Sequence, residues 1–255
     1  MKRLRYIPTI EGPAHEQMAI DEAILQAFDD GKIPTTLRFF RFDPSAITVG
    51  YSQDIDKVIH THKCEEYDIP FVRRITGGGT VYHDYHGEIT YSIVTQQLEG
   101  SIQESFKYLL DPIINTLRGY GLEAKFKPYN DILISRKKVS GSAQKRGKKG
   151  LLQHGTLMYA TDLDKLADIL KLDKEKLKEK GVSSFFELVT TMEKELGEKP
   201  EPDELIEKMK DCYEEHLGNN FETSSLTELE KGYVTELKEK YKSPEWTYDR
   251  RGNKL

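Results

Sequence analysis

Two adjacent arginines and three consecutive glycines stand in the segment RRITGGGTVYHD, residues 73–84. The N–H groups of such a glycine turn can form a concavity for an anion, and a guanidinium fork matches the geometry of a phosphate. Because neighbouring side chains of an extended segment point to opposite faces, only one of Arg73 and Arg74 should enter such a site. A hairpin turn beside surface arginines explains the same residues equally well, since neither GxxxxGK[ST] nor GxGxxG is present.

A second cluster, RKKVSGSAQKR at residues 136–146, places lysines before a run of small residues. An ammonium group there could contact an anion or a reactive carbonyl, and the small residues would let a ligand approach the backbone. Residues 136–150 contain seven basic residues and no acidic one. Such a run can bind an anionic ligand, a nucleic acid or an acidic protein surface, or it can form a flexible, solvated hairpin.

Three further residue types could carry chemistry. Asp131 opens an apolar strand in NDILI, where a carboxylate can hold Mg²⁺ beside phosphates or simply form a turn. His154 lies in the β-rich segment QHGTLMY, where a histidine is either a ligand or a hydrogen-bonded core residue. Cys64 and Cys212 have no CxxC partner and no local signature of a nucleophile, which argues against a disulfide framework and a cysteine metal site. Cys212 falls on the apolar side of a predicted helix and is expected in the core.

Apolar periodicity and turn signals predict the elements that must position these residues. A helix is predicted over residues 14–31 and a short polar helix over 55–67. A third helix begins at Ser101, which forms a capping box with Glu104 before an apolar stripe that includes Ile102. Strands or extended segments are predicted at residues 35–42, 45–53, 70–75, 80–84, 87–96, 123–135, 137–144 and 150–160.

The chain becomes helical from Asp162 onward, with a second capping box predicted at Ser225 and Glu228. Residues 197–204, GEKPEPDE, could form a subdomain hinge or only a loop. Strands dominate residues 36–160 and helices flank or follow them, which predicts an α+β fold with a mixed, mostly antiparallel sheet. The strands lie too close together for repeated βαβ crossovers, so a doubly wound sheet is disfavoured.

The composition is that of an ordinary globular chain of 255 residues, with 37% hydrophobic residues, 32% charged residues and a net charge of −5. No apolar run approaches the roughly 20 residues that a membrane span requires. The basic N-terminus is not followed by the apolar segment of a secretory signal. Together with the unpaired cysteines, these features predict a cytoplasmic protein with no membrane partner.

Six segments in this order resemble the lipoate–protein ligase A family: MAIDEAI, RRITGGGTVYHD, NDILI, RKKVSGSAQ, LLQHGTLMY and SPEWTY. They span about residues 17–248, and six motifs in sequence are far more specific than any one of them. The resemblance implies the biotin/lipoate protein ligase catalytic-domain fold, which is similar to that of class II aminoacyl-tRNA synthetases. It also implies activation of lipoate by ATP and Mg²⁺ to lipoyl-AMP. The lipoyl group then passes to a lysine of apo lipoyl domains, which are 2-oxoacid dehydrogenase E2 subunits or the glycine cleavage H protein.

The same resemblance assigns roles to individual residues. Lys138 is the catalytic residue, an electrostatic clamp on the mixed anhydride, and Asp131 helps to position Mg²⁺ or that lysine. Arg74 and the backbone after the glycines hold the nucleotide and the acyl-phosphate. The substrate- and ATP-binding positions implied in this way are Arg74, Gly77, Gly78, Gly79, Thr80, Val81, Tyr82, His83, Lys138, Ser140, Gly141, Ser142, Ala143 and His154.

Two alternatives stand beside the ligase. Octanoyl-carrier-protein:protein N-octanoyltransferases share the fold, use a cysteine nucleophile and need no ATP. Their variant that resembles this family usually has an arginine for the third glycine and a cysteine just before NDILI. Here Gly79 is intact and AKFKPYND has no cysteine, which favours the ligase, although the sequence does not rank lipoate against octanoate. A non-catalytic module that binds lipoyl domains or RNA leaves the combination of Arg74, Gly79 and Lys138 unexplained, so no nucleic-acid partner is predicted.

The chain departs from longer ligases at its C-terminal end. Those proteins continue past the PEW motif with an accessory domain, whereas this chain stops at Leu255. We therefore expect residues 1–255 to form a single catalytic domain without the accessory domain, with a core over about 1–196 and a helical segment over about 197–255. A separate small accessory ligase subunit is then expected to support the activation step.

Overall fold

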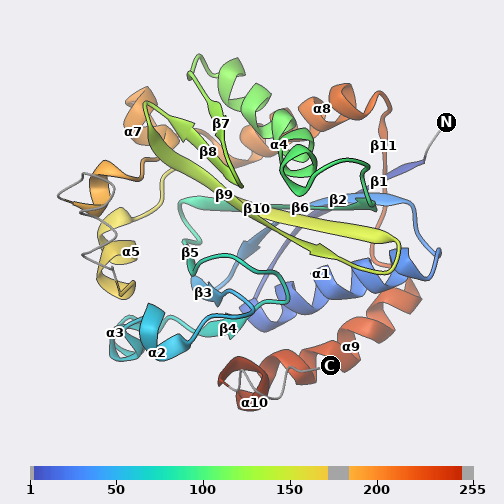
Figure 1. Cartoon of the computed structure of the whole chain (residues 1–255), viewed down its shortest axis with the longest axis horizontal. Helices are drawn as coiled ribbons and strands as arrows, with labels where there is room; N and C mark the ends of the chain where they lie inside the picture. Colours follow the sequence, from blue (N-terminus) through green and yellow to red (C-terminus); the bar gives the residue numbers. More distant parts are fainter. Residues whose placement is uncertain (1–2, 172–183, 249–255) are drawn as a thin grey trace.

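The computed structural model describes residues 3–171 and 184–248, in which strands form one large and one small sheet (Figure 1). Within these residues the large sheet has eight strands in the order β11–β1–β2–β6–β10–β9–β8–β7, and the small sheet has the order β4–β3–β5. The strands are β1 (Leu4–Gly12), β2 (Thr35–Phe42), β3 (Ala46–Val49), β4 (Phe71–Arg73), β5 (Val81–His83), β6 (Glu88–Gln96), β7 (Lys125–Lys127), β8 (Asp131–Ile134), β9 (Lys137–Arg146), β10 (Gly150–Met158) and β11 (Phe221–Thr223).

Helices cover both faces of the large sheet and the outer side of the small one. They are α1 (Ala14–Asp29), α2 (Ile55–Val58), α3 (Thr61–Glu66), α4 (Ile102–Gly119), α5 (Leu163–Ile169), the 3₁₀ turn η1 (Phe185–Glu187), α7 (Met192–Leu196), α8 (Pro202–Leu217), α9 (Glu228–Lys242) and α10 (Pro244–Tyr248). The helical pattern predicted from Asp162 onward extends over residues 172–183, which lie outside the described residues. Among the described residues, no helix has both the length and the apolar character needed to cross a membrane.

Strand pairing confirms the predicted α+β class with a mixed, mostly antiparallel sheet. From β2 to β7 every neighbouring pair of the large sheet is antiparallel. Parallel pairs occur where β1 meets β2 and β11, and where β3 meets β4. The apolar pattern of the sequence predicted neither β1 nor β11. Both depend on partners distant in the chain, since buried Arg5 of β1 pairs with Glu230, more than two hundred residues away.

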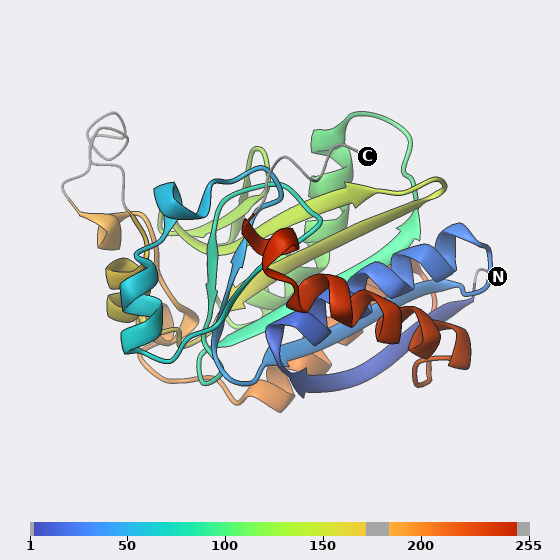
Figure 2. The ribbon, with the colours of Figure 1, turned by 90° about the horizontal axis from the view of Figure 1, so that it is seen from below.

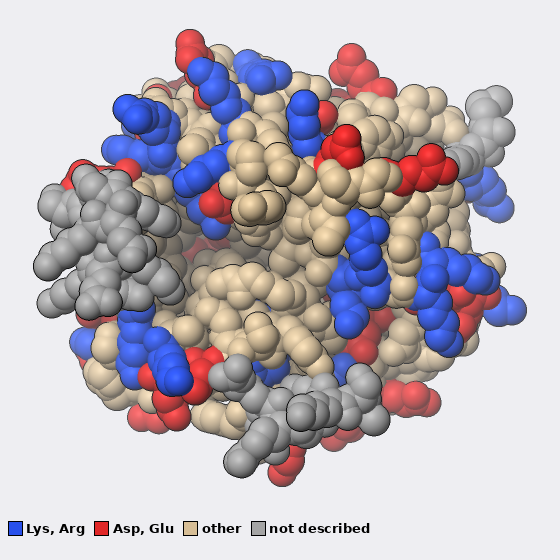
Figure 3. Space-filling view, in the orientation of Figure 1, with Lys and Arg blue, Asp and Glu red and all other residues tan. Residues whose placement is uncertain are grey.

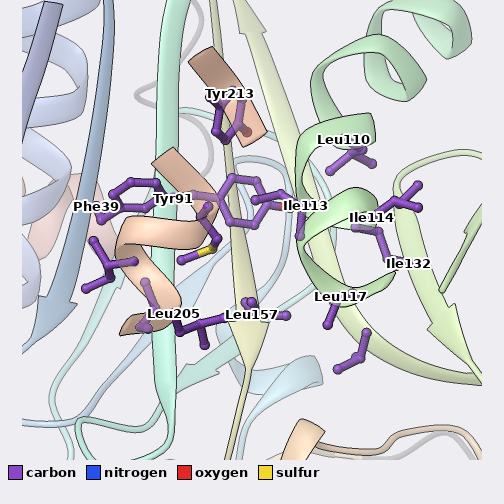
Figure 4. Close-up of a cluster of buried hydrophobic side chains, with 14 of the residues drawn as sticks. Phe39, Tyr91, Leu110, Ile113, Ile114, Leu117, Ile132, Leu157, Leu205 and Tyr213 are labelled. Atoms are coloured by element: carbon purple, nitrogen blue, oxygen red, sulfur yellow. The ribbon is translucent and has the colours of Figure 1, made fainter. Parts of the chain in front are cut away.

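The largest apolar cluster lies between the sheet and the helices α4 and α8. The amphipathic pattern of α4 turns one side of that helix toward the sheet, where its leucine and isoleucine side chains are buried. Figure 4 shows these side chains meeting those of α8 and of the sheet. On the other face of the sheet, α1 and α9 lie side by side (Figure 2) and bury a second cluster with Phe40 and Phe42.

The predicted capping box at the start of α4 is confirmed, because the Glu104 N–H donates to Ser101 Oγ and the Ser101 N–H to Glu104. The second box was predicted two residues too early. Helix α9 is capped by Thr227 with Glu230, although Ser225 with Glu228 fits the same pattern. Tertiary structure selects between them, since Glu230 is fully buried and binds Arg5 with both carboxylate oxygens.

The burial of two other residues differs from what the apolar periodicity predicted. Ile102 was expected in the apolar stripe of α4, but it is the first residue of that helix and 59% of its surface is exposed. Cys212 was expected in the core and is only half-buried on α8, because the buried side of that helix runs through Leu205, Met209 and Tyr213. Residues 197–201, within the segment that could have been a hinge, form a short connection from α7 to α8.

Two isoleucines on α4 test this description of the core. Ile113→Ala should lower the free energy of unfolding by about 2–5 kcal/mol, because a fully buried side chain would leave a cavity. The matched change Ile102→Ala removes an exposed side chain and should alter that free energy by less than about 0.5 kcal/mol. Denaturant unfolding measures both values, and similar losses in the two variants would contradict the packing of α4 described here.

Candidate functional site

A cavity of about 180 Å³ lies where the small sheet meets β9 and β10 of the large one. Figure 3 shows a hollow on this face of the molecule, with basic side chains along part of its edge. One part of the wall is apolar and is formed by Met18, Phe42, Val81, Met158, Leu166, Leu170, Phe185 and Val189. The other part carries guanidinium, ammonium, hydroxyl and imidazole groups. The cavity therefore joins an apolar chamber to a cationic wall.

Most residues that the resemblance placed in a site do line this cavity. They are Arg74, Gly78, Gly79, Thr80, Val81, Tyr82, His83, Lys138, Gly141, Ser142, Ala143 and His154. Three predicted residues are not part of its lining. Gly77 accepts a hydrogen bond from Arg74 through its carbonyl, Ser140 is fully buried with its hydroxyl 3.0 Å from the Tyr91 hydroxyl, and Asp131 binds Lys138.

The two adjacent arginines point to opposite sides of β4. Arg73 donates to the backbone carbonyls of Gly50, Tyr51, Gln53 and Thr247, and the last of these bonds ties the small sheet to α10. Arg74 instead lines the cavity and is buried. Among the described residues, no carboxylate forms an ion pair with Arg74, and desolvation lowers its pKa to about 10. The sequence left an anion cradle and a plain turn equally open, and the structure places one buried cation beside the glycines.

The N–H groups of the Arg74 guanidinium donate hydrogen bonds to uncharged oxygens. Its Nη2 donates to the carbonyls of Gly77 and Gly79 at 2.7 Å each, so the side chain holds the glycine segment from inside. Its Nε donates to Thr76 Oγ1 at 2.9 Å, and its Nη1 to both the carbonyl and the hydroxyl of Thr48 at 3.1 Å. Gly78, at the centre of this loop, has a φ of +90°, which side chains with a Cβ rarely adopt.

Each of these two threonines is hydrogen bonded to a histidine, and each histidine is in turn hydrogen bonded to an acidic side chain. Thr76 Oγ1 lies 2.7 Å from His154 Nε2, and His154 Nδ1 lies 2.7 Å from Asp21. Thr48 Oγ1 lies 3.0 Å from His83 Nε2, whose Nδ1 lies 3.1 Å from Glu88. We call these two rows the threonine–histidine chains. Each hydroxyl accepts a hydrogen bond from Arg74 and still offers one proton and a second lone pair to the Nε2 atom beside it. A carboxylate can only accept, so His154 carries a proton on Nδ1, the atom that faces Asp21.

The charges in these chains follow from burial. Burial, with help from the positive charge of Arg74, lowers the pKa of His83 well below its usual value, so this imidazole is neutral. Burial also raises the pKa of Glu88 well above its usual range. Desolvation alone would raise the pKa of Asp21, but Arg38 and His154 outweigh it and lower that pKa. The carboxylate of Asp21 is held by Arg38 at 2.8 Å and by Ser92 at 2.9 Å.

Lys138 is held in place by an ion pair and by backbone hydrogen bonds. Its Nζ lies 2.7 Å from Asp131 Oδ1 across the β8–β9 pair. A bulge in this pairing separates it from Ser140, and its backbone is bound on both sides by the segment after η1, through Leu188 and Thr190. Gly141 lies opposite Asp131, and a Cβ there would come within 2.4 Å of Lys138 Nζ. The ammonium group occupies the space that the missing side chain leaves.

Four residues of this site were not predicted: Asp21, Thr48, Thr76 and Glu88. An acid within the apolar run MAIDEAIL and another at the start of the apolar strand EITYSIV were the available signals. Buried acids need partners, so each marked a polar contact inside the core. The threonines gave no such signal, because a hydroxyl in a strand or turn is ordinary.

The family model of the lipoyl protein ligase A/B catalytic domain matches residues 13–214. The chain belongs to this family. Octanoyltransferase LipM of Clostridioides difficile is 34% identical, with 91% of this chain and 94% of that protein aligned. Octanoyltransferase LipM of Bacillus subtilis is 30% identical, with 96% and 98% aligned.

Two solved structures are similar throughout. The bi-partite lipoate protein ligase of an archaeal lipoylation system from Thermoplasma acidophilum has a TM-score of 0.86 at 30% identity, covering 97% of both chains. A lipoate-protein ligase A bound with ATP has a TM-score of 0.82 at 28% identity, covering 96% of this chain and 97% of that one. These structures confirm the lipoate ligase catalytic-domain fold that the motifs implied.

The curated relatives overturn the predicted activity. All of the relatives compared above are octanoyltransferases, so the assignment of an ATP-dependent lipoate–protein ligase is wrong. The predicted cofactors ATP and Mg²⁺, and lipoate with lipoyl-AMP as substrate and intermediate, are corrected with it. The accessory subunit was expected only because of the activation step, so the reason for expecting it is removed as well. Asp131, predicted to hold Mg²⁺, binds Lys138, and the described residues contain no group of three or more His, Cys, Asp or Glu that could hold a metal ion.

The intact third glycine was one of the two features that favoured the ligase. A Cβ added at Gly79 would meet nothing within 4 Å, and its φ is not in the left-handed region. The backbone at this position therefore does not require glycine. The other departure, the missing cysteine before NDILI, is a genuine feature of this chain.

Thr76 offers a test of the threonine–histidine chains. Thr76→Val should lower the free energy of unfolding by about 1–3 kcal/mol, because it leaves the buried Arg74 Nε and His154 Nε2 without a partner. Thr76→Ser keeps the hydroxyl and should lose about 0.8 kcal/mol, the contribution of one methyl group. Denaturant unfolding of both variants measures these free energies. Equal losses of unfolding free energy in the two variants would contradict a role for the Thr76 hydroxyl.

Proposed function

We propose that this chain transfers an octanoyl group from a thioester donor to the lysine amine of an apo lipoyl domain. The names of the curated relatives support the octanoyl group and the class of reaction. One observation in the structure carries the proposal, namely that an apolar chamber and two fixed cations, Arg74 and Lys138, line the same cavity. An acyl chain requires the first feature, and a carbonyl that acquires negative charge requires the second.

In this proposal Lys138 acts on the carbonyl oxygen of the donor. When an amine adds to a thioester, this oxygen becomes an oxyanion, and donors that are already oriented stabilise it without reorganising. Lys138 supplies such a donor on a side chain that Asp131 holds in place. Arg74 acts mainly by shaping the glycine segment, because its own N–H groups are occupied by protein oxygens. In this proposal Gly77–Tyr82 and Ser140–Ala143 form the walls around the acyl carbonyl, with His83 and His154 behind them.

A thioester donor also explains why no activation step is needed. The acyl group of a thioester is already activated, and its transfer to an amine releases a thiol and forms a more stable amide. A nucleotide would add nothing to that exchange. The choice between octanoate and lipoate, which the sequence left open, is made here for octanoate on the names of the relatives.

The acceptors in this proposal are the apo lipoyl domains of E2 subunits and of the H protein. The basic residues of segment 136–150 support docking of an acidic partner, since Lys145, Lys148 and Lys149 are exposed at the far end of the β9–β10 hairpin. We further propose that residues 1–255 act as one catalytic domain. The C-terminal segment supports this idea, because β11 joins the large sheet and α9 packs on α1. A cytoplasmic location stays a prediction.

A direct assay tests the proposal. The chain is incubated with an apo lipoyl domain and an octanoyl thioester of an acyl carrier, and the intact mass of the lipoyl domain is followed. Transfer is expected without nucleotide, and Lys138→Ala should lower kcat by about 10²–10³-fold, as for the loss of one oxyanion donor. Absence of transfer from the thioester, with a lipoyl domain that a known octanoyltransferase can modify, would overturn the proposed function.

A pair of glycine variants tests the position of the ammonium group. Gly141→Ala should lower the transfer rate by at least about tenfold, because the new Cβ displaces Lys138 Nζ from Asp131, and misplacement by about 1 Å can cost up to 10²-fold. Folding should be nearly unchanged, since the displaced atoms are the tip of a flexible side chain. Gly79→Ala serves as the control and should transfer at close to the wild-type rate, because its Cβ enters open space. A fully active Gly141→Ala variant would contradict the role of the Lys138–Asp131 pair.

A further inference from the structure

A short stretch of chain, residues 188–190, borders the apolar chamber and is also hydrogen bonded to Lys138. We propose that Val189 in this stretch is a positioning residue. An acyl chain that fills the chamber packs against the Val189 side chain and thereby holds Lys138 beside the reacting carbonyl. This inference rests on the proposed function and adds a determinant of specificity, because the length of the acyl chain then affects kcat as well as binding.

Lys138 has a different neighbour from the rest of β9. Strand β10 pairs with β9 only as far as Ser140, so it does not reach Lys138. Its place is taken by Val189, which forms a parallel bridge with Lys138. The Lys138 N–H donates to the Leu188 carbonyl at 2.7 Å, and the Thr190 N–H donates to the Lys138 carbonyl at 2.9 Å. The backbone of Lys138 is therefore held by the two peptide groups that flank Val189.

The opposite side of Lys138 is held less regularly. There it pairs with Leu133 of β8, directly beside the bulge in the β8–β9 pairing, and a bulge interrupts a ladder of hydrogen bonds locally. The ammonium group has little room, since it lies 2.7 Å from Asp131 and fills the space above Gly141. A small shift of the 188–190 stretch would therefore move the ammonium group relative to a bound carbonyl, and misplacement by about 1 Å can cost up to 10²-fold in rate.

The side chain of Val189 connects this backbone to the chamber. Val189 lines the cavity together with Phe185 and belongs to the apolar cluster of the small sheet. A β-branched side chain has few alternative rotamers, so a contact with its methyl groups is passed to the backbone. On the side that borders the cavity, the free protein gives Val189 no packing partner, and an acyl chain would supply those contacts.

The residues that follow Val189 are anchored in the main body of the protein. The Thr190 hydroxyl donates to Glu195 at 2.7 Å, and Met192 is fully buried in the largest apolar cluster. The Glu193 N–H donates to the Tyr159 carbonyl at 2.8 Å. Because this end of the stretch is fixed, the packing of Val189 acts on its own peptide groups and on Lys138.

The size of the cavity gives the coupling a preferred chain length. The cavity measures about 180 Å³, and a dry protein cavity of about 150 Å³ holds a six-carbon ring, so a chain close in length to octanoyl suits it. Each methylene that leaves the chamber would lower affinity about fourfold. If the chamber served binding alone, shorter chains would raise KM and leave kcat unchanged. If the chain also positions Lys138, shorter chains lower kcat as well.

Hydrogen exchange tests the coupling without catalysis. Octanamide carries the acyl chain and the carbonyl but no leaving thiol, and it is added to the full chain at a saturating concentration. Exchange of the Lys138 and Thr190 amide protons is followed by NMR. We expect octanamide to slow both at least about fivefold and saturating hexanamide to slow them less than about twofold, because only the longer chain packs against Val189. Octanamide that binds without slowing these two protons would overturn the inference.

Turnover of two donors provides the second test. The wild type should transfer octanoyl from its carrier thioester with a kcat at least about tenfold above that for hexanoyl. Val189→Ala should reduce this kcat ratio to within about twofold, and Val189→Ile, with its longer side chain, should raise kcat for hexanoyl. Leu166→Ala is the matched control, because Leu166 lines the chamber from α5 and has no backbone bond to Lys138. It should raise KM and keep the kcat ratio of the wild type.

The outcomes separate this inference from the proposed function. A chain length that changes only KM in the wild type, or an unchanged kcat ratio in folded Val189→Ala, would overturn the inference and leave the proposed function standing. If circular dichroism shows that Val189→Ala does not fold, the Val189→Ile variant and the exchange measurement on the wild type decide. Failure of the wild type to transfer from either thioester would overturn the proposed function, whereas the exchange measurement would still test the link between the chamber and Lys138.

Discussion

The site depends on one buried guanidinium that has no carboxylate partner among the described residues. A charge removed from water must be surrounded by oriented dipoles, and Arg74 meets this need with carbonyls of Thr48, Gly77 and Gly79 and with two hydroxyls. These acceptors come from β3 and from the glycine segment, so the guanidinium ties the small sheet to the loop. Its two hydroxyl acceptors, Thr48 and Thr76, also begin the two threonine–histidine chains, which extend to acidic side chains on α1 and β6.

The same framework serves two chemistries in the proteins that it resembles. The similar solved structures are lipoate ligases, whereas the curated sequence relatives are octanoyltransferases. A cavity that joins an apolar chamber to a cationic wall suits either an acyl-adenylate or a thioester, because both present a carbonyl that becomes an oxyanion. Fold similarity therefore does not decide the donor. The motifs were correct about the family, and the residue chosen to separate its branches, Gly79, lies where the structure has room for a side chain.

The polar residues of the cavity differ in what they can do. Those around Arg74 are buried and hydrogen bonded, and burial shifts the pKa of His83 and of Glu88 toward their neutral forms, which suits a rigid wall. Lys138 and Asp131 are partly exposed and held by the β8–β9 bulge and by the segment after η1, which suits contact with two macromolecular substrates. Rigidity on one side and access on the other allow orientation of the reactants to supply much of the rate.

The sequence by itself determined the family, the α+β class, most strands and many of the residues that line the cavity, because motifs and periodicity are local properties of the chain. It did not determine β1 and β11, which pair with each other from distant segments, or the cap of α9, where Glu230 binds Arg5. It also could not show that Thr76 and Thr48 link Arg74 to His154 and His83, because an ordinary hydroxyl acquires a role only from its neighbours in space. Tertiary structure alone decided which arginine enters the cavity, where Asp131 binds, and that neither cysteine lines the cavity. Each of these depends on which distant segments meet when the chain folds.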